Sequence, residues 1–217
     1  MRKSNPFFLR VWGKRACFTH PATKIERMSY PVITPSASEG IFGGIFWKPE
    51  FDWHIQEIIV EAPIVYGNIR RNEVSCRGTY PSSSVIAKGG EHSPIDATSI
   101  EDKVRIQRNT LFLRDVSYVI SGVIRLRDSS LKLTKYEEMF ERRASSGQGV
   151  YQPYLGCREF AAFWEYLGRE APQVHPIQES LDLGMMPLQV FRQGVMKPQF
   201  FRAKMINGVV HVPGKEG

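Results

Sequence analysis

Residues 30–53, which read YPVITPSASEGIFGGIFWKPEFDW, constrain the fold more than any other stretch of the chain. Thr34 is a good helix N-cap because its hydroxyl can accept from an amide of the first turn, and Pro35 has no amide to leave unpaired there. The next apolar residues recur every four positions, as on one face of a helix: Ala37, Ile41 and Ile45. The stretch therefore predicts a helix that starts at residue 35 and is stopped by Pro49.

Strands are predicted on both sides of this helix. Residues 7–12 (FFLRVW) alternate as a strand does, and an apolar run covers residues 53–60. Strand, helix, strand is half of a ferredoxin-like unit. One face of the first strand carries Phe8, Arg10 and Trp12, a pattern that RNA-recognition sheets use to stack unpaired bases. The alternative is that Phe8 and Trp12 are core residues beneath a covering element.

The rest of the chain alternates between irregular and regular segments. Residues 75–99 are rich in Ser, Gly and Pro, and we interpret them as a flexible insertion, a type of segment that can order on binding. Residues 103–126 are predicted to form one arm of a hairpin and then a strand, and residues 157–167 (CREFAAFWEYL) are interpreted as a further strand. Asn207 and Gly208 are typical of a type I′ turn and predict a closing hairpin.

A second helix is predicted at residues 134–145. Thr134 and Glu137 have the spacing of a capping box, which predicts that Thr134 is the N-cap. Lys135 and Tyr136 then lie in the first turn, where free amides and the helix dipole attract anions. A lysine there is unfavourable for the helix itself, which makes Lys135 a candidate functional residue.

Most of the net charge lies in the first 30 residues. The chain of 217 residues has a formal net charge of +7, and residues 1–30 hold seven basic side chains against one acidic side chain. A basic patch on a nearly neutral body predicts a polyanionic partner, and a merely solvated basic terminus is the alternative. The candidate residues for this contact are Lys14, Arg15, Lys24, Arg27, Lys48, Arg70, Arg71, Arg105 and Arg108.

The composition argues against several other classes of protein. No apolar run approaches the roughly 20 residues of a membrane helix and the N-terminus lacks a signal core, so a cytoplasmic protein without membrane contact is predicted. Cys17, Cys76 and Cys157 are far apart and are predicted to be free thiols. No clustered ligands indicate a metal site, and no cofactor motif appears. His20, in the basic loop, is either a catalytic substitute or a surface residue.

Several blocks of the sequence resemble one known family. The blocks are VWG, TKIERMSYPVITPSA, IFWKP, IRRNEV and LGCREF, in this order between about residues 9 and 160. They are similar to type I-C CRISPR-associated proteins of the Cas five-d group. The resemblance implies an α+β fold, with a ferredoxin-like (RRM-like) domain and its hairpin insertion in residues 1–146. Residues 147–217 would then supply a glycine-rich loop, a closing strand and a small C-terminal antiparallel β-sheet.

The resemblance also implies a function. Family members cut the precursor of CRISPR RNA at the base of its repeat hairpin, without a metal or another cofactor. They stay on the 5′ handle as a subunit of the Cascade surveillance complex. The implied partners are CRISPR repeat RNA and the backbone and large subunits of Cascade, with target DNA within the complex as a further candidate.

Three catalytic positions are implied by the same resemblance. A tyrosine before the WKP motif falls on Phe46, and a lysine–histidine pair at a helix start falls on Lys135 and Tyr136. Phe46 has no hydroxyl, and Tyr136, whose unperturbed pKa is about 10, is a poor general base at neutral pH. Lys135 can still stabilise charge on the scissile phosphate.

Three functions follow as hypotheses. The first is a metal-independent endoribonuclease that keeps its product. The second is a non-catalytic Cascade subunit that binds the handle and caps the backbone. The third is a generic RNA-recognition module unrelated to CRISPR.

Overall fold

One long strand, β5 (Arg105–Leu126), is the centre of the structure. The computed structural model describes residues 2–23, 25–75, 80–90, 104–189 and 198–214. The other strands are β1 (Phe7–Ala16), β2 (Arg27–Met28), β3 (Phe51–Val60), β4 (Tyr66–Val74), β6 (Phe163–Gly168), β7 (Leu181–Gln189), β8 (Gln199–Ile206) and β9 (Val209–His211). Within the described residues these form one sheet in the order β6-β1-β5-β3-β9-β8-β7, and β2 and β4 also pair with β5. The fold is therefore mixed, with one large, mainly antiparallel sheet and few helices.

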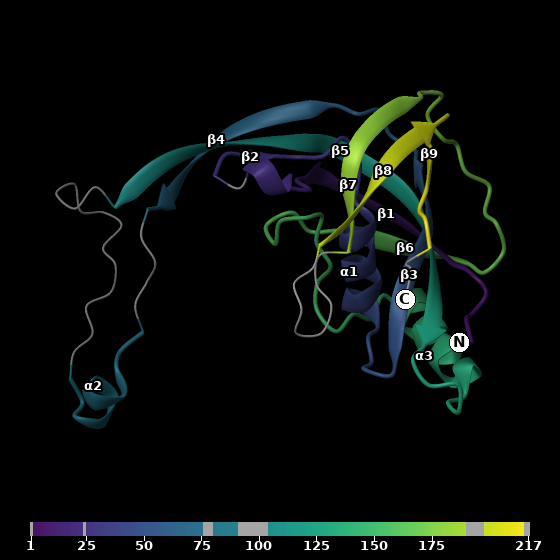
Figure 1. The fold of residues 1–217 in the computed structure, drawn as a ribbon, viewed down its shortest axis with the longest axis horizontal. Helices are drawn as coiled ribbons and strands as arrows, with labels where there is room; N and C mark the ends of the chain where they lie inside the picture. Colours follow the sequence, from purple (N-terminus) through teal and green to yellow (C-terminus); the bar gives the residue numbers. More distant parts are fainter. Residues whose placement is uncertain (1, 24, 76–79, 91–103, 190–197, 215–217) are drawn as a thin grey trace.

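β5 has different neighbours along its length. Its first half pairs with β4, and its second half lies between β1 and β3. Figure 1 shows β4 and the adjoining part of β5 arching away from the body, towards the short helix α2 (Ser83–Ala87). The predicted hairpin is confirmed. α2 lies within the predicted insertion, and residues 76–79 and 91–99 of that insertion are outside the described part of the chain.

The two longer helices, α1 (Pro35–Ile45) and α3 (Leu133–Ser145), pack on the sheet through the main hydrophobic core. Alternate residues of β1 enter this core and are fully buried: Phe7, Leu9 and Val11. A smaller cluster lies apart from it and is formed by Phe8, Ile59 and Val119. The sequence did not decide whether Phe8 and Trp12 are core residues or exposed. In the structure Phe8 is buried and Trp12 is exposed.

Two local predictions are confirmed. The hydroxyl of Thr34 accepts from the amide of Ala37, and α1 begins at Pro35. Asn207 and Gly208 join β8 to β9 with φ of 48° and 76°, the two positive values that a type I′ turn requires. In both places the signal lies within a few adjacent residues.

Two other local predictions are wrong. α3 begins at Leu133 after Lys132, which makes no capping hydrogen bond through its side chain, so Thr134 is not the N-cap. Glu137 does not complete a capping box, because its Oε1 accepts from Nη2 of Arg169 at 2.5 Å. The strand predicted from residue 157 begins only at residue 163, since residues 157–160 form a turn closed by the amide of Phe160.

The C-terminal segment contributes to the same sheet as the N-terminal one. β6 pairs with β1, and β9 pairs with β3. β7, β8 and β9 form the predicted antiparallel C-terminal strands, and the division of the chain at residue 146 stays a prediction. Cys17 and Cys157 are free thiols, and Cys76 lies outside the described residues. None of the described helices combines the length and apolarity needed to span a membrane.

Gly156 holds the 147–156 loop against the end of β1. Its φ is 83°, and an added Cβ would lie 2.0 Å from the carbonyl oxygen of Cys17. Gly147, in the same loop, has a φ of 66° with open space around it. We expect Gly147→Ala to lower the free energy of unfolding by about 1–2 kcal/mol, the backbone cost alone. Gly156→Ala should lower it by about 2–5 kcal/mol, because overpacking adds about 1–3 kcal/mol. Urea denaturation of both variants measures the difference, and equal losses would contradict the close approach.

Candidate functional site

The end of α1 fixes Phe46 inside the protein. α1 ends at Ile45, and Phe46 follows in an extended backbone conformation. Its carbonyl oxygen accepts from Nε1 of Trp53 at 2.8 Å. The side chain of Phe46 is only 1% exposed. Phe46 is therefore a core residue at the position where the resemblance places a catalytic tyrosine.

A chain of aromatic rings connects Phe46 to α3. The ring of Phe51 lies 5.4 Å from that of Phe46 and 5.6 Å from that of Tyr136. The helices also meet directly, because Phe42 of α1 stacks on Phe140 of α3 at 5.6 Å. The structure thus brings Phe46 and Tyr136 together across one intervening ring.

Tyr136 and Lys135 have opposite environments at the start of α3. Tyr136 is 5% exposed, and burial, with the nearby negative charge of Glu50, raises the pKa of its hydroxyl. Lys135 is exposed, and its Nζ lies 5.8 Å from the centre of the Tyr136 ring. The first amides of a helix have no partner within it, so the start of α3 favours anions. Lys135 adds an exposed cation there.

Arg143 is a further cation at this site, which the sequence analysis did not single out. Its guanidinium carbon lies 5.8 Å from the centre of the Phe46 ring. Lys48 is exposed two residues beyond Phe46. Arg143 could have been found from the sequence, because it follows Tyr136 by seven residues and so lies on the same face of the helix.

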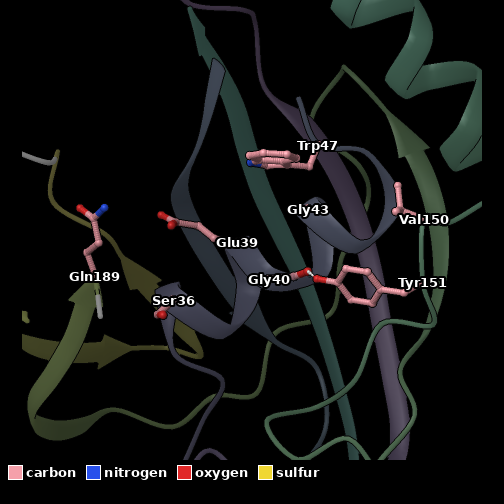
Figure 2. Close-up of a pocket in the computed structure, with 8 residues that line it drawn as sticks. All are labelled: Ser36, Glu39, Gly40, Gly43, Trp47, Val150, Tyr151 and Gln189. Atoms are coloured by element: carbon pink, nitrogen blue, oxygen red, sulfur yellow. Dashed lines mark hydrogen bonds between the residues drawn. The ribbon is translucent and has the colours of Figure 1, made fainter. Parts of the chain in front are cut away.

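A hollow of about 400 Å³ lies beside this site along the outer side of α1. Figure 2 shows Trp47 near one end of it, and Tyr151, whose hydroxyl donates to the carbonyl of Gly40 at 3.2 Å, beside the helix. Glu39 lines the hollow, and no lysine or arginine is among its described lining residues. It is therefore a poor site for a phosphate.

The predicted polyanion-binding residues divide into two groups. Three arginines are engaged by carboxylates: Arg27 and Arg108 each lie 3.4 Å from Glu73, and Arg71 is hydrogen-bonded to Glu159. Two carboxylates balance most of the charge of these three guanidinium groups, so the arginines are less available to a phosphate than the sequence suggested.

The second group is exposed. Lys14, Arg15, Lys48 and Arg105 form no ion pair with any residue that the structure describes. Arg70 is exposed, and among the described residues its side chain donates to Oδ1 of Asn109, at 3.5 Å. Lys24 lies outside the described residues.

His20 is separate from the site around Phe46. It lines a different hollow together with Thr34, at the opposite end of α1, so about 16 Å of helix lies between the two places. Its Nδ1 accepts from the amide of Ala22 at 3.2 Å. Among the described residues, no three His, Cys, Asp or Glu side chains lie close enough together to hold a metal ion.

Comparisons with known proteins agree with this fold. The family model Cas_Cas5d, a CRISPR-associated protein (Cas_Cas5), matches residues 8–213. The chain is 38% identical to the CRISPR pre-crRNA endoribonuclease Cas5d of Mannheimia succiniciproducens, over 97% of this chain and 96% of that protein. It is 36% identical to the protein of the same name from Thermus thermophilus, over 96% of this chain and 91% of the relative.

A solved structure has the same fold. The crystal structure of a CRISPR-associated protein matches with a TM-score of 0.70 and 24% identity, over 99% of this chain and 94% of that one. The match to the family model covers nearly the whole chain, and the two relatives are similar along almost their entire length. The chain therefore belongs to the Cas5d family of CRISPR-associated proteins.

Proposed function

We propose that this protein is an endoribonuclease that cleaves precursor CRISPR RNA at the base of the repeat hairpin and stays on the 5′ handle as a Cascade subunit. The observation that carries the proposal is the similarity, along almost the whole chain, to two relatives named as pre-crRNA endoribonucleases. Family membership also removes the hypothesis of an RNA-recognition module unrelated to CRISPR.

The proposal includes a ferredoxin-like arrangement for the first part of the chain. Its support is the element order β1, α1, β3, β5, α3, β6 together with the strand order β6-β1-β5-β3. The three pairings in that order are antiparallel. β4, with α2 beyond it, is then the hairpin insertion.

Cleavage of RNA by its own 2′-OH has three requirements. The 2′-oxygen must be aligned with the phosphorus and lose its proton to water as it attacks, and negative charge on the phosphorane must be stabilised. The leaving 5′-oxygen must receive a proton, here from water, as its bond to phosphorus breaks and a 2′,3′-cyclic phosphate forms. Alignment and charge stabilisation alone give useful rates when one turnover is enough. A reaction of this kind uses no metal and no other cofactor.

The residues of the site supply these requirements unequally. Lys135 is the charge stabiliser, because it is exposed at a helix start that favours anions. Tyr136 positions the 2′-OH and does not remove its proton, since its raised pKa leaves it protonated at neutral pH. Phe46 takes no part in proton transfer, and Arg143 above it adds a second positive charge.

The competing function is a non-catalytic subunit that binds the handle and caps the backbone of the complex. The observation in its favour is Phe46, which lacks a hydroxyl and is buried. RNA binding is common to both functions and is assigned to the exposed cations, Lys14, Arg15, Lys48, Arg70 and Arg105. Only the chemistry at Lys135 separates them.

Lys135→Ala tests the proposed chemistry. We expect single-turnover cleavage of a labelled repeat RNA in EDTA to slow by roughly a hundredfold or more, the scale of one lost charge stabiliser. Binding of the RNA should stay within a few-fold, because the phosphate keeps its other contacts. Lys132→Ala, which removes an exposed cation just before the helix, is the matched control and should cleave at nearly the normal rate. Absence of cleavage by the unaltered protein, with tight handle binding, would leave the non-catalytic function.

Phe46→Tyr tests whether the missing hydroxyl can be restored. The ring is fully enclosed, so the added hydroxyl would enter the core. We expect the free energy of unfolding to fall by about 1–3 kcal/mol, the cost of a buried polar group without a partner. The cleavage rate should not rise. A faster single-turnover rate in the same EDTA assay would show that the hydroxyl reaches the RNA and that position 46 belongs to the catalytic site.

Arg70 and Arg71 are expected to respond differently to substitution by lysine. Arg70→Lys should weaken cognate RNA more than scrambled RNA, because only the planar fork of arginine pairs with a guanine edge. Arg71→Lys should mainly reduce the melting temperature, since Arg71 is tied to Glu159 and to Oγ1 of Thr110. Filter binding with both RNAs and thermal unfolding separate the two effects. An equal loss of RNA affinity in both variants would contradict the separate roles given to Arg70 and Arg71.

A further inference from the structure

Two aromatic side chains stack on the outside of the sheet, on adjacent strands. Trp12 of β1 pairs in register with Phe163 of β6, and their ring centres lie 6.2 Å apart at an angle of 26°. Trp12 is 38% exposed and Phe163 is 56% exposed. Because side chains alternate along a strand, Trp12 lies on the same face as Phe8 and opposite the core residues Leu9 and Val11. The aromatic pair thus offers a stacking surface away from the α1–α3 core.

A hollow of about 570 Å³ opens beside this pair, within the size range of small-ligand sites. Its charged lining residues are balanced, with Arg10 and Lys14 against Asp115 and Glu165. Arg10 is also held by Glu61 at 3.0 Å and by Glu165 at 3.1 Å. Aromatic walls and no net charge suit an uncharged planar group. A nucleobase is such a group.

A second hollow of about 410 Å³ adjoins the first and has a different charge. The two share Lys14 and Asp115. The second adds Arg15 and Arg114, so it has three cations against one carboxylate. The side chains of Lys14, Arg15 and Arg114 make no hydrogen bond or ion pair with another described residue. An anion therefore fits this hollow, beside a site for an uncharged ring.

We propose that the two hollows together bind one unpaired nucleotide of the RNA substrate. The base stacks on the Trp12–Phe163 pair, and its phosphate lies among Lys14, Arg15 and Arg114. The ribose, which joins base to phosphate, lies at the shared wall, where Asp115 accepts a hydrogen bond from the 2′-OH. This contact favours RNA over DNA, because DNA lacks that hydroxyl.

The inference rests on the proposed function for the identity of the RNA, and it uses a site distinct from Lys135. Hydrophobic patches also mark protein interfaces, which is the competing use of the aromatic pair. The adjoining cations favour nucleic acid, because a base stack next to a positively charged groove is the usual way of binding a single strand. A protein partner on this face would need an acidic surface of its own. Without one, it would bury Lys14, Arg15 and Arg114 with no carboxylates to pair with them.

The experiment uses the full chain and a fluorescein-labelled, unstructured RNA of about seven nucleotides, a length that one single-strand site covers. Trp12→Leu and Phe163→Leu should each weaken binding roughly 5- to 150-fold, the range for loss of one stacked base. Trp12→Phe should bind within a few-fold of the unaltered protein, because a ring remains. Substitution of Lys14, Arg15 and Arg114 by Ala should make the slope of log affinity on log salt shallower by about 2, from roughly 0.7 per contact. Lys204→Ala, an exposed cation on β8, is the control and should leave both measurements unchanged.

The short RNA has no repeat hairpin, so its binding is measured without cleavage, and a protein that fails to cut can still bind it. Circular dichroism confirms that each variant is folded. If Trp12→Leu is unfolded, Phe163→Leu still tests whether the base stacks on the aromatic pair. A second test is the quenching of tryptophan fluorescence by the RNA, which Trp12→Phe should lose. Unchanged affinity in both leucine variants would overturn the proposal and leave a protein interface. Equal binding of the same sequence as DNA would overturn the assignment to RNA.

Discussion

The packing of aromatic rings between the sheet and the two longer helices is the interaction on which the rest of the structure depends. Phe140 lies 4.9 Å from Phe7 and 4.7 Å from Trp53, and Trp53 lies 4.8 Å from Phe42. Such pairs contribute about 0.5–1.5 kcal/mol each beyond the burial of their area. The cluster joins α1, α3, β1 and β3, and so it fixes the position of the end of α1 relative to α3. The same packing encloses Phe46, which makes that position structural in this chain.

The distribution of acidic side chains decides which cations remain available to bind a polyanion. Glu73 and Glu159 pair with Arg27, Arg71 and Arg108, which come from three separate segments of the chain, and hold these side chains beside the β4–β5 pairing. Partly exposed ion pairs of this kind contribute little individually, and a network of them orients side chains more than it adds stability. The cations without such partners in the described part of the chain, which include Arg70 and Arg105 of the same hairpin, are the ones that can exchange counterions for phosphates.

The sequence predicted those parts of the fold whose signals are local. Thr34 with Pro35, and Asn207 with Gly208, each specify a helix start or a turn through adjacent residues. Thr134 and Glu137 have an equally clear local pattern, but Glu137 binds Arg169, a partner 32 residues away that spacing cannot reveal. The ion pairs of Arg71 and the register of Trp12 with Phe163 likewise join distant segments. The catalytic positions came only from resemblance, because burial of Phe46 depends on how two helices and a strand meet.

The two proposed sites, one at the start of α3 and one on β1 and β6, would serve different stages of one reaction. In the proposed reaction, contacts at Lys135 would change as charge develops on the scissile phosphate, and only such contacts accelerate the chemical step. A base stacked on Trp12 and Phe163 makes the same contacts before and after the bond is cut. Binding of that kind does not raise the rate, but it keeps the product bound. An enzyme that acts once and then becomes part of a complex needs both kinds of contact. The stacking site lies on β1 and β6 and Lys135 lies on α3, so each site can be altered by mutation without changing the other.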